Sequence, residues 1–223
     1  MQGVAGADKV WPFEGLCELL MVDLFDPAWE VRHGAVLGLR EVIKVHGAGA
    51  GRIVGKTSSE NDKRNRKWLE DLSCRLCCIF ALDRFGDYVA DQVVAPVRES
   101  AAQTLGALLL HLPEPVIKDT FNVLCNLVLQ KDLGITSPLW EACHGGMLGL
   151  RYLVSVRTDI LFNDTTYLDG LITCVLLGLQ ESDDDVQAMS AATLIPIASE
   201  LVSLRPQTIP HLLEVIWNCL GDL

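Results

Sequence analysis

Apolar residues recur along most of this chain at the three- and four-residue spacing that places them on one face of an α-helix. Polar turns or prolines separate the segments, and Pro96 stands where a helix can begin. The first eight segments form four pairs, and the ninth has no partner. The pattern therefore predicts an all-α protein. The predicted helices span residues 12–25, 30–45, 68–85, 96–112, 114–130, 139–156, 166–180, 184–202 and 209–220.

Two of these segments are copies of one another. The stretch WEVRHGAVLGLR, from Trp29 to Arg40, returns as WEACHGGMLGLR, from Trp140 to Arg151. Eight of the twelve positions are identical without a gap, at an offset of 140 − 29 = 111 residues. Weaker copies in the same frame contain Val97 and Val186. The chain is therefore built from an internal repeat.

The repeat has a period of about 45 residues. The equivalent positions Val31, Val97, Ala142 and Val186 are separated by 66, 45 and 44 residues. Removing the polar stretch 47–67, which is 21 residues long, shortens the first gap to 45 residues. Helix pairs with this period are typical of HEAT and armadillo arrays. We therefore expect a HEAT/ARM-like α-solenoid of antiparallel helix pairs, about four and a half repeats long, with 47–67 as a flexible polar insertion.

The same frame suggests the domain boundaries. Residues 1–9 carry no helical pattern and are expected to be a disordered segment, whereas 10–223 form one repeat array. Natural arrays end in repeats with a polar outer face, but the last segment is rich in apolar residues, including Leu212 and Trp217. We therefore expect an unfinished C-terminal repeat, whose neighbour is the rest of a longer parent polypeptide.

Composition narrows the class of partner. The formal net charge is −11, from 29 acidic and 18 basic side chains. Because binding to nucleic-acid backbones depends on lysine and arginine, no direct nucleic-acid binding is expected. The charge suits a basic protein partner. No uninterrupted apolar run reaches the ~18 residues of a spanning helix, so no membrane is expected either. Most of the eight cysteines lie in apolar helical patterns and are expected to be buried thiols.

One stretch resembles a nucleotide-binding motif. AGRIVGKT, from Ala50 to Thr57, fits a relaxed phosphate-loop pattern, and Asp83 ends a later apolar run as a magnesium-binding carboxylate could. A working phosphate loop connects a strand to a helix, but the repeat requires a helix before Ala50 and a polar stretch follows Thr57. A nucleotide-binding enzyme using residues 50–57 remains as an alternative. Otherwise we expect no cofactor, no metal and no catalytic residue; Cys74, Cys77 and Cys78 lack the second pair that a zinc site needs.

The insertion also contains the basic run KRNRK. A short basic cluster on an exposed loop fits a nuclear-import signal, although a solvated charge cluster has the same composition. The candidate import residues are Lys63, Arg64, Arg66 and Lys67.

The turns within the helix pairs are acidic. In a solenoid these turns lie along one edge, so their carboxylates would form a negative ridge for a basic partner. Helix capping and the helix dipole offer an alternative explanation for part of them. The candidate partner-binding residues are Asp26, Glu30, Asp83, Asp87, Asp91, Asp132, Glu181, Asp183, Asp184 and Asp185.

The long stretches WPFEGLCELLMVDLFDPAWEVRHGAVLGLRE and LQESDDDVQAMSAATLIP closely resemble the TATA-binding-protein-associated factors of the Mot/Swi–Snf ATPase family. The resemblance implies a nuclear transcription regulator whose HEAT array grips TATA-binding protein, and whose separate ATPase domain removes that protein from promoter DNA. No ATPase motif is present in this chain, which is therefore expected not to be an enzyme. Spacer repeats without direct partner contact are the alternative. One departure is that Ala142-Cys143 stand where the first copy has Val31-Arg32.

Overall fold

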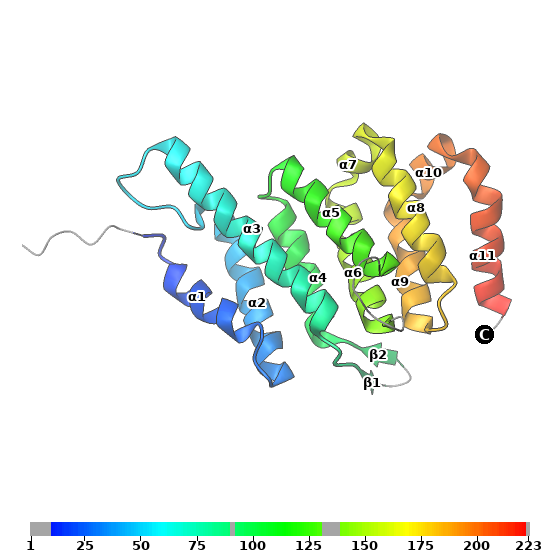
Figure 1. Cartoon of the computed structure of the whole chain (residues 1–223), viewed down its shortest axis with the longest axis horizontal. Coiled ribbons are helices and arrows are strands. Elements are labelled where there is room, and N and C mark those ends of the chain that lie inside the picture. Colours follow the sequence, from blue (N-terminus) through cyan, green and yellow to red (C-terminus); the bar gives the residue numbers. More distant parts are fainter. Residues whose placement is uncertain (1–9, 90–91, 131–138, 222–223) are drawn as a thin grey trace, which may run out of the picture.

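The computed structural model describes residues 10–89, 92–130 and 139–221. Helix pairs follow one another along the long axis of the molecule, from the N-terminal end to the C-terminal end (Figure 1). The helices are α1 (Glu14–Asp23), α2 (Trp29–His46), α3 (Ser58–Leu82), α4 (Pro96–Leu109), α5 (Glu114–Leu129), α6 (Trp140–Val156), α7 (Thr158–Asn163), α8 (Thr165–Leu179), α9 (Asp184–Leu194), α10 (Ala198–Leu204) and α11 (Ile209–Gly221).

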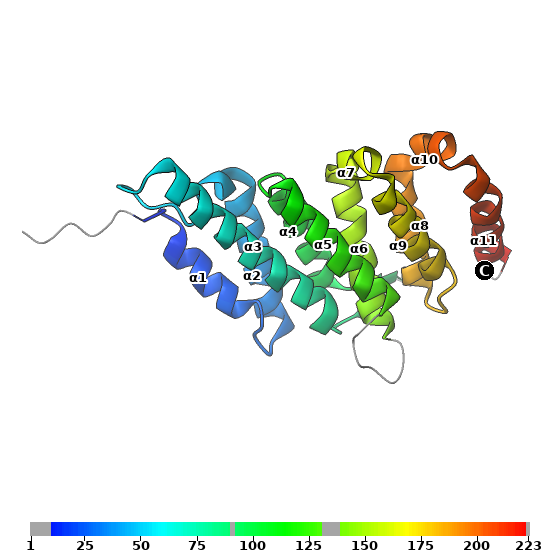
Figure 2. The ribbon, with the colours of Figure 1, turned by 45° about the horizontal axis from the view of Figure 1, so that its top comes forward.

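The helices form two layers, as the turned view shows (Figure 2). The first layer contains α1, α3, α5, α8 and α11, and the second contains α2, α4, α6 and α9. Within the second layer α4 packs against α2 and α6, and α6 packs against α9. In the first layer α5 packs against α3 and α8, and α8 against α11. The predicted α-solenoid of paired helices is confirmed.

Close packing between the layers depends on small residues at particular positions. Phe80 at the end of α3 is fully buried, and the backbone of α6 passes directly against it. A Cβ atom added at Gly145 would lie 2.4 Å from the carbonyl oxygen of Phe80. The equivalent Gly34 in α2 has nothing within 4 Å of the same point. Close approach therefore requires glycine in one copy of the repeat and not in the other.

The predicted loop through Lys67 is wrong, because α3 already begins at Ser58. Thr57 and Glu60 form a capping box: the Thr57 side chain accepts from the Glu60 amide, and the Glu60 carboxylate accepts from the Thr57 amide. Such a cap satisfies amides that a helix start leaves unpaired. A capped, exposed helix start needs no apolar face, so the polar residues Ser58–Lys67 extend α3 instead of forming a loop.

Other departures from the predicted helices are local. The turn between α3 and α4 contains two short antiparallel strands, β1 (Asp87–Val89) and β2 (Gln92–Val94), with Tyr88 opposite Val93. A short helix, α7, precedes α8. The second helix of the fourth pair is divided into α9 and α10 by a tight helical turn, Ile195–Ile197, which contains Pro196. Proline lacks an amide hydrogen and clashes with the carbonyl four residues earlier, so it interrupts the helix there.

Among the described residues, the stretch Asp184–Leu204 is long and apolar enough by length and composition to cross a membrane. In this structure it is the divided second helix of the fourth pair, and α9 packs against α6 and α8. Val186, Ile197 and Leu201 of this stretch are buried in the array, whereas Ile195 and Val202 are exposed. The expected disorder of residues 1–9 concerns positions outside the described residues.

Candidate partner-binding surface

The turns between α1 and α2, between α3 and α4, and between α8 and α9 lie along one edge of the array, the lower edge in Figure 1. We call this the turn edge. The second-layer helices begin at this edge, so the positive ends of their dipoles point toward it. Acidic residues occupy the first turns of all four of these helices, namely Glu30 in α2, Glu99 in α4, Glu141 in α6, and Asp184 and Asp185 in α9. Acidic side chains from separate repeats therefore lie near this edge, and their role in partner binding stays a prediction.

Asp83 does not belong to an accessible ridge, and its prediction as a partner-binding residue is wrong. Its side chain is only 2% exposed, and its carboxylate accepts a hydrogen bond from Arg32 Nε at 2.9 Å. The same carboxylate accepts from the amide of Phe85 at 3.0 Å. The Arg32 guanidinium also donates to the carbonyl of Asp26 at 2.8 Å. Asp83 therefore joins the first repeat to the second.

Two other acidic residues are partly engaged in shaping turns. Asp26 accepts a hydrogen bond from the amide of Ala28 at 2.8 Å, and Asp183 is the N-cap of α9, accepting from the amide of Val186 at 3.1 Å. Both are partly exposed, as are Glu181 and Asp185, whereas Glu30 and Asp184 are exposed. The capping explanation is therefore correct for part of the set. The side chain of Asp87, and the whole of Asp91 and Asp132, lie outside the described residues.

A buried arginine lies behind this edge. Arg98, in the first turns of α4, is fully buried, and its guanidinium lies 5.3 Å from the centre of the Trp140 ring. Its Nη1 donates to the carbonyl of Asp83 at 3.0 Å. Burial lowers the pKa of Arg98, while the carboxylates of Asp83, Glu141, Asp183 and Asp185 act to raise it. Carboxylates from three repeats therefore surround one buried cation.

The repeat frame could have suggested this arrangement. Arg98 occupies the position of Arg32, and Trp140 that of Trp29. Trp29 stacks on Phe85 with ring centres 4.6 Å apart, so in each copy the tryptophan at the helix start contacts the second repeat. What sequence reasoning missed was that Arg98 would be buried, because burial depends on the neighbouring turns.

His144, in α6, is a second buried polar group of this region. It is 6% exposed, and its Nδ1 has no hydrogen-bond partner among the described residues. Burial, with a smaller contribution from the nearby Arg98 charge, lowers the pKa of His144 to about 3. The imidazole is therefore neutral at physiological pH.

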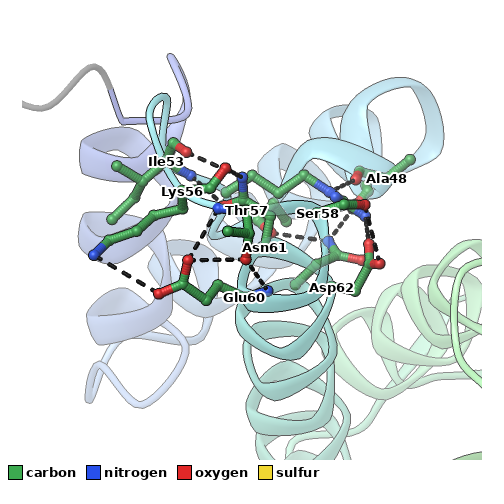
Figure 3. Close-up of polar contacts among 12 residues, drawn as sticks. Ala48, Ile53, Lys56, Thr57, Ser58, Glu60, Asn61 and Asp62 are labelled. Atoms are coloured by element: carbon green, nitrogen blue, oxygen red, sulfur yellow. Dashed lines mark hydrogen bonds and ion pairs between the residues drawn. The ribbon is translucent and has the colours of Figure 1, made fainter.

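The stretch 50–57 leads into helix α3, as a phosphate loop leads into a helix, but the rest of its geometry differs from a phosphate loop (Figure 3). It follows helix α2 and a short helical turn, Gly47–Gly49, instead of a buried strand. The Ile53 amide donates to Asn61 Oδ1 at 2.8 Å, and the Thr57 amide donates to Glu60. Lys56 lies 4.0 Å from the Glu60 carboxylate. The amides of Ile53 and Thr57 and the side chain of Lys56, which a phosphate loop would direct at phosphate, thus already have partners within the protein. The geometry therefore gives a nucleotide site no support.

Side chains of α3 also hold this stretch against the array. Asn65 Nδ2 donates to the carbonyls of Gly47 at 3.0 Å and Ala50 at 2.8 Å, and Arg64 Nε donates to the carbonyl of Gly51 at 2.9 Å. We call residues 47–57 the strap. The strap connects α2 to α3 and is held in place by these hydrogen bonds.

The candidate import residues lie on a helix, so their prediction as an exposed loop is wrong. Lys63, Arg64, Arg66 and Lys67 are all exposed on the first turns of α3. Arg64 is engaged by the strap, and Arg66 Nε pairs with Glu70 at 2.6 Å. The capping box of Thr57 and Glu60 and these contacts favour a helical over an extended conformation for the basic run.

Five of the eight cysteines are buried, whereas Cys74, expected to be buried, is exposed and Cys78 and Cys219 are half-buried. Burial raises the pKa of Cys17 to about 11 and, with smaller contributions from neighbouring groups, the pKa of Cys77 and of Cys143 to about 12. Thiols with raised pKa values are poor nucleophiles and poor metal ligands. Within the described part of the chain, no cluster of three or more histidine, cysteine or acidic side chains could hold a metal ion.

Nearly the whole chain is similar in sequence to known proteins from fungi and from human. The chain is 56% identical over 218 residues to the TATA-binding protein-associated factor mot1 of Aspergillus fumigatus, which is 98% of this chain and 12% of that protein. It is 52% identical to TATA-binding protein-associated factor MOT1 of Saccharomyces cerevisiae, covering 97% of this chain and 12% of that protein. The resemblance to the TATA-binding protein-associated factors is therefore confirmed. The human TATA-binding protein-associated factor 172 is 46% identical, over 96% of this chain and 11% of that protein.

The chain thus spans about 12% of the length of the curated relatives it matches. No protein-family model matches it. Among solved structures, an engineered protein is similar with a TM-score of 0.42 and 17% identity, over 82% of this chain and 64% of that one. Those values are too low to support an inference.

Proposed function

We propose that this chain is a protein-interaction segment of a transcription regulator, that it binds TATA-binding protein through the turn edge, and that it performs no chemistry. The observation that carries the proposal is the gathering of exposed or partly exposed carboxylates from separate repeats at one edge of a strongly acidic chain. The relatives are named as factors associated with TATA-binding protein. An acidic edge steers a basic protein surface toward itself and repels nucleic-acid backbones.

Exposed carboxylates at a rim act mainly through long-range attraction. Such charges change the association rate and the salt dependence of binding more than they change the contact itself. Glu30 and Asp184 are the exposed members of the set among the described side chains, and both lie in the first turn of a second-layer helix. They are therefore the residues to reverse without disturbing a cap or an ion pair.

The test is calorimetric titration of the purified chain with TATA-binding protein at low and moderate salt. The double variant Glu30→Lys/Asp184→Lys should weaken binding by about tenfold or more at low salt, and its salt dependence should be smaller. The matched control, Glu18→Lys/Glu214→Lys, makes the same charge change at exposed positions in α1 and α11, away from the turn edge. It should bind nearly as the unaltered chain does.

Two outcomes would contradict the proposal. Equal weakening by both double variants would mean that net charge alone drives the association. No binding by a chain shown to be helical and monomeric would favour the alternative, in which these repeats only space the partner-binding repeats from other domains.

We also propose that other parts of a longer polypeptide cover the two ends of the array. At α1 the outward residues Leu19 and Val22 are 67% and 73% exposed, and at α11 Trp217 is 75% exposed. Apolar faces of this kind in a stacked array are normally covered by a neighbouring repeat. In the whole protein we expect an ATPase domain to remove TATA-binding protein from promoter DNA in the nucleus, as the resemblance implies.

A further inference from the structure

A hollow of about 290 Å³ lies on the second layer, close to the turn edge. Four successive second-layer helices or their starts contribute to it, so it crosses the repeats instead of belonging to one. At this volume it lies at the lower limit of small-molecule pockets. Its polar lining consists of His33, Glu99, Ser100, His144 and Asp185, and Met189 is among the apolar residues.

Two carboxylates give the hollow its negative charge. Glu99 is held in place, because Oε1 accepts a hydrogen bond from Tyr152 Oη at 2.8 Å and another from Gln103 Nε2 at 3.3 Å. Asp185 has no ion pair and no side-chain hydrogen bond within the described part of the chain. Burial raises the pKa of Asp185, and so does repulsion from Asp183 and Asp184 on the same turn, whereas the charge of the buried Arg98 acts to lower it. An added cation would relieve that repulsion.

His144, which also lines the hollow, is a buried polar residue with a nitrogen that is unpaired among the described residues. Its ring is more than nine-tenths buried, and Nδ1 lacks a partner in the described ranges. A neutral imidazole carries one donor and one acceptor nitrogen. Leaving a buried polar atom of this kind unpaired is costly, and native proteins rarely do so without a reason. A cationic side chain that enters the hollow carries several N–H donors, which the unprotonated nitrogen of a neutral imidazole can accept.

The two nearby arginines, Arg98 and Arg151, do not cancel the negative charge of Glu99 and Asp185 in the hollow. Arg98 is fully buried behind it and does not line it. Arg151 donates from Nη1 to Met189 Sδ at 3.4 Å and does not line the hollow either. Neither forms an ion pair with Asp185 or Glu99 among the described contacts. The polar lining of the hollow therefore consists of the carboxylates of Glu99 and Asp185, the neutral His144, His33 and Ser100.

We propose that this hollow receives a lysine or arginine side chain of the basic protein partner, so that one residue of the partner is anchored across three repeats. The inference rests on the proposed function and names its anchoring site. A long cationic side chain can place its charged end between Asp185 and Glu99 while its carbon stem contacts Pro96, Leu148 and Met189, which also line the hollow. Nucleic acid is the wrong occupant, since its phosphates would meet carboxylates.

The histidines of the chain allow the site to be located directly. Of the five, His33 and His144 line the hollow, whereas His46, His111 and His211 do not. His46 ends α2 and His111 follows the end of α4, so both lie at the edge opposite to the turn edge. NMR spectra of the chain with isotope-labelled histidine should show shifts of the His33 and His144 signals when TATA-binding protein is added. The other three should stay in place.

A charge-neutral variant tests the contact itself. Asp185→Asn should weaken binding of TATA-binding protein by about tenfold, as expected when a desolvated charge pair loses one partner. Asp184→Asn is the matched control, because it makes the same change one residue earlier in the same helix turn, outside the hollow. It should weaken binding by less than about threefold, as a rim charge does. Circular dichroism checks that both variants remain folded.

The outcomes separate the two proposals. If the partner binds while the His33 and His144 signals stay unchanged, or if Asp185→Asn and Asp184→Asn weaken binding equally, the anchoring site is wrong and the proposed function stands. If the partner does not bind at all, both are wrong.

Discussion

Gly34 and Gly145 occupy the same position in two copies of the repeat, and we predict that replacing each with alanine has opposite effects on stability. Both lie inside long helices, α2 and α6. Alanine is favoured over glycine in a helix interior by about 1 kcal/mol. At Gly34 the new Cβ meets nothing within 4 Å, so Gly34→Ala should raise the free energy of unfolding by about 0.5–1 kcal/mol.

At Gly145 the same gain in helix propensity is opposed by a clash. The added Cβ would lie 2.4 Å from the Phe80 oxygen and 2.9 Å from its Cα. Normal van der Waals contact is ~3.5 Å or more, so the α3 backbone must move by roughly 1 Å. Overpacking of this kind costs about 1–3 kcal/mol, and occasionally more. Gly145→Ala should therefore lower the free energy of unfolding by about 1–2 kcal/mol.

The assay is urea unfolding of the two variants and the unaltered chain, followed by far-ultraviolet circular dichroism. The midpoint should rise for Gly34→Ala and fall for Gly145→Ala. In thermal unfolding, each kcal/mol corresponds to about 2–4 °C for a chain of this length. Changes of the same sign and size in both variants would refute the reasoning, because they would show that α6 does not approach α3 as closely as described.

Three further predictions concern polar contacts. Asp83→Asn removes the carboxylate that pairs with Arg32 at 2.9 Å and should cost about 1–3 kcal/mol in urea unfolding, whereas a change within ~0.5 kcal/mol would contradict its linking role. Because burial lowers the pKa of His144 from 6.5 to about 3, the unfolded chain binds a proton that the folded chain excludes. The free energy of unfolding should therefore fall as the pH is lowered from 6.5 to about 3, by up to about 1.4 kcal/mol per pH unit. A pH profile of His144→Gln that is no less steep than that of the unaltered chain would disprove this assignment. Asn65→Ala removes two hydrogen bonds to the strap and should speed its proteolysis, whereas protection of the strap by magnesium and ATP would revive the nucleotide alternative.

The helices and their repetition could be predicted from local pattern because helical periodicity and capping act over a few residues. The pairing of helices followed from the period, and the position of the acidic turns followed from the pairing. The beginning of α3 can also be predicted from the sequence, because Thr57 and Glu60 match the capping-box pattern. It was missed because a polar segment was expected to be a loop.

The role of each side chain was decided by residues far away in the chain. Asp83 looked like a member of the ridge until Arg32, 51 residues earlier, was found paired with it. Gly34 and Gly145 are both glycine at the same repeat position, yet only Gly145 lies in close contact with another helix.

The hollow beside His144 likewise exists only where four second-layer helices meet. The sequence by itself determined the solenoid, its period and the sign of its charge, because these depend on local spacing and composition. Only the tertiary structure decided which carboxylates are buried, which are free to meet a partner, and where a basic side chain can enter. Those properties depend on which atoms of distant repeats come into contact.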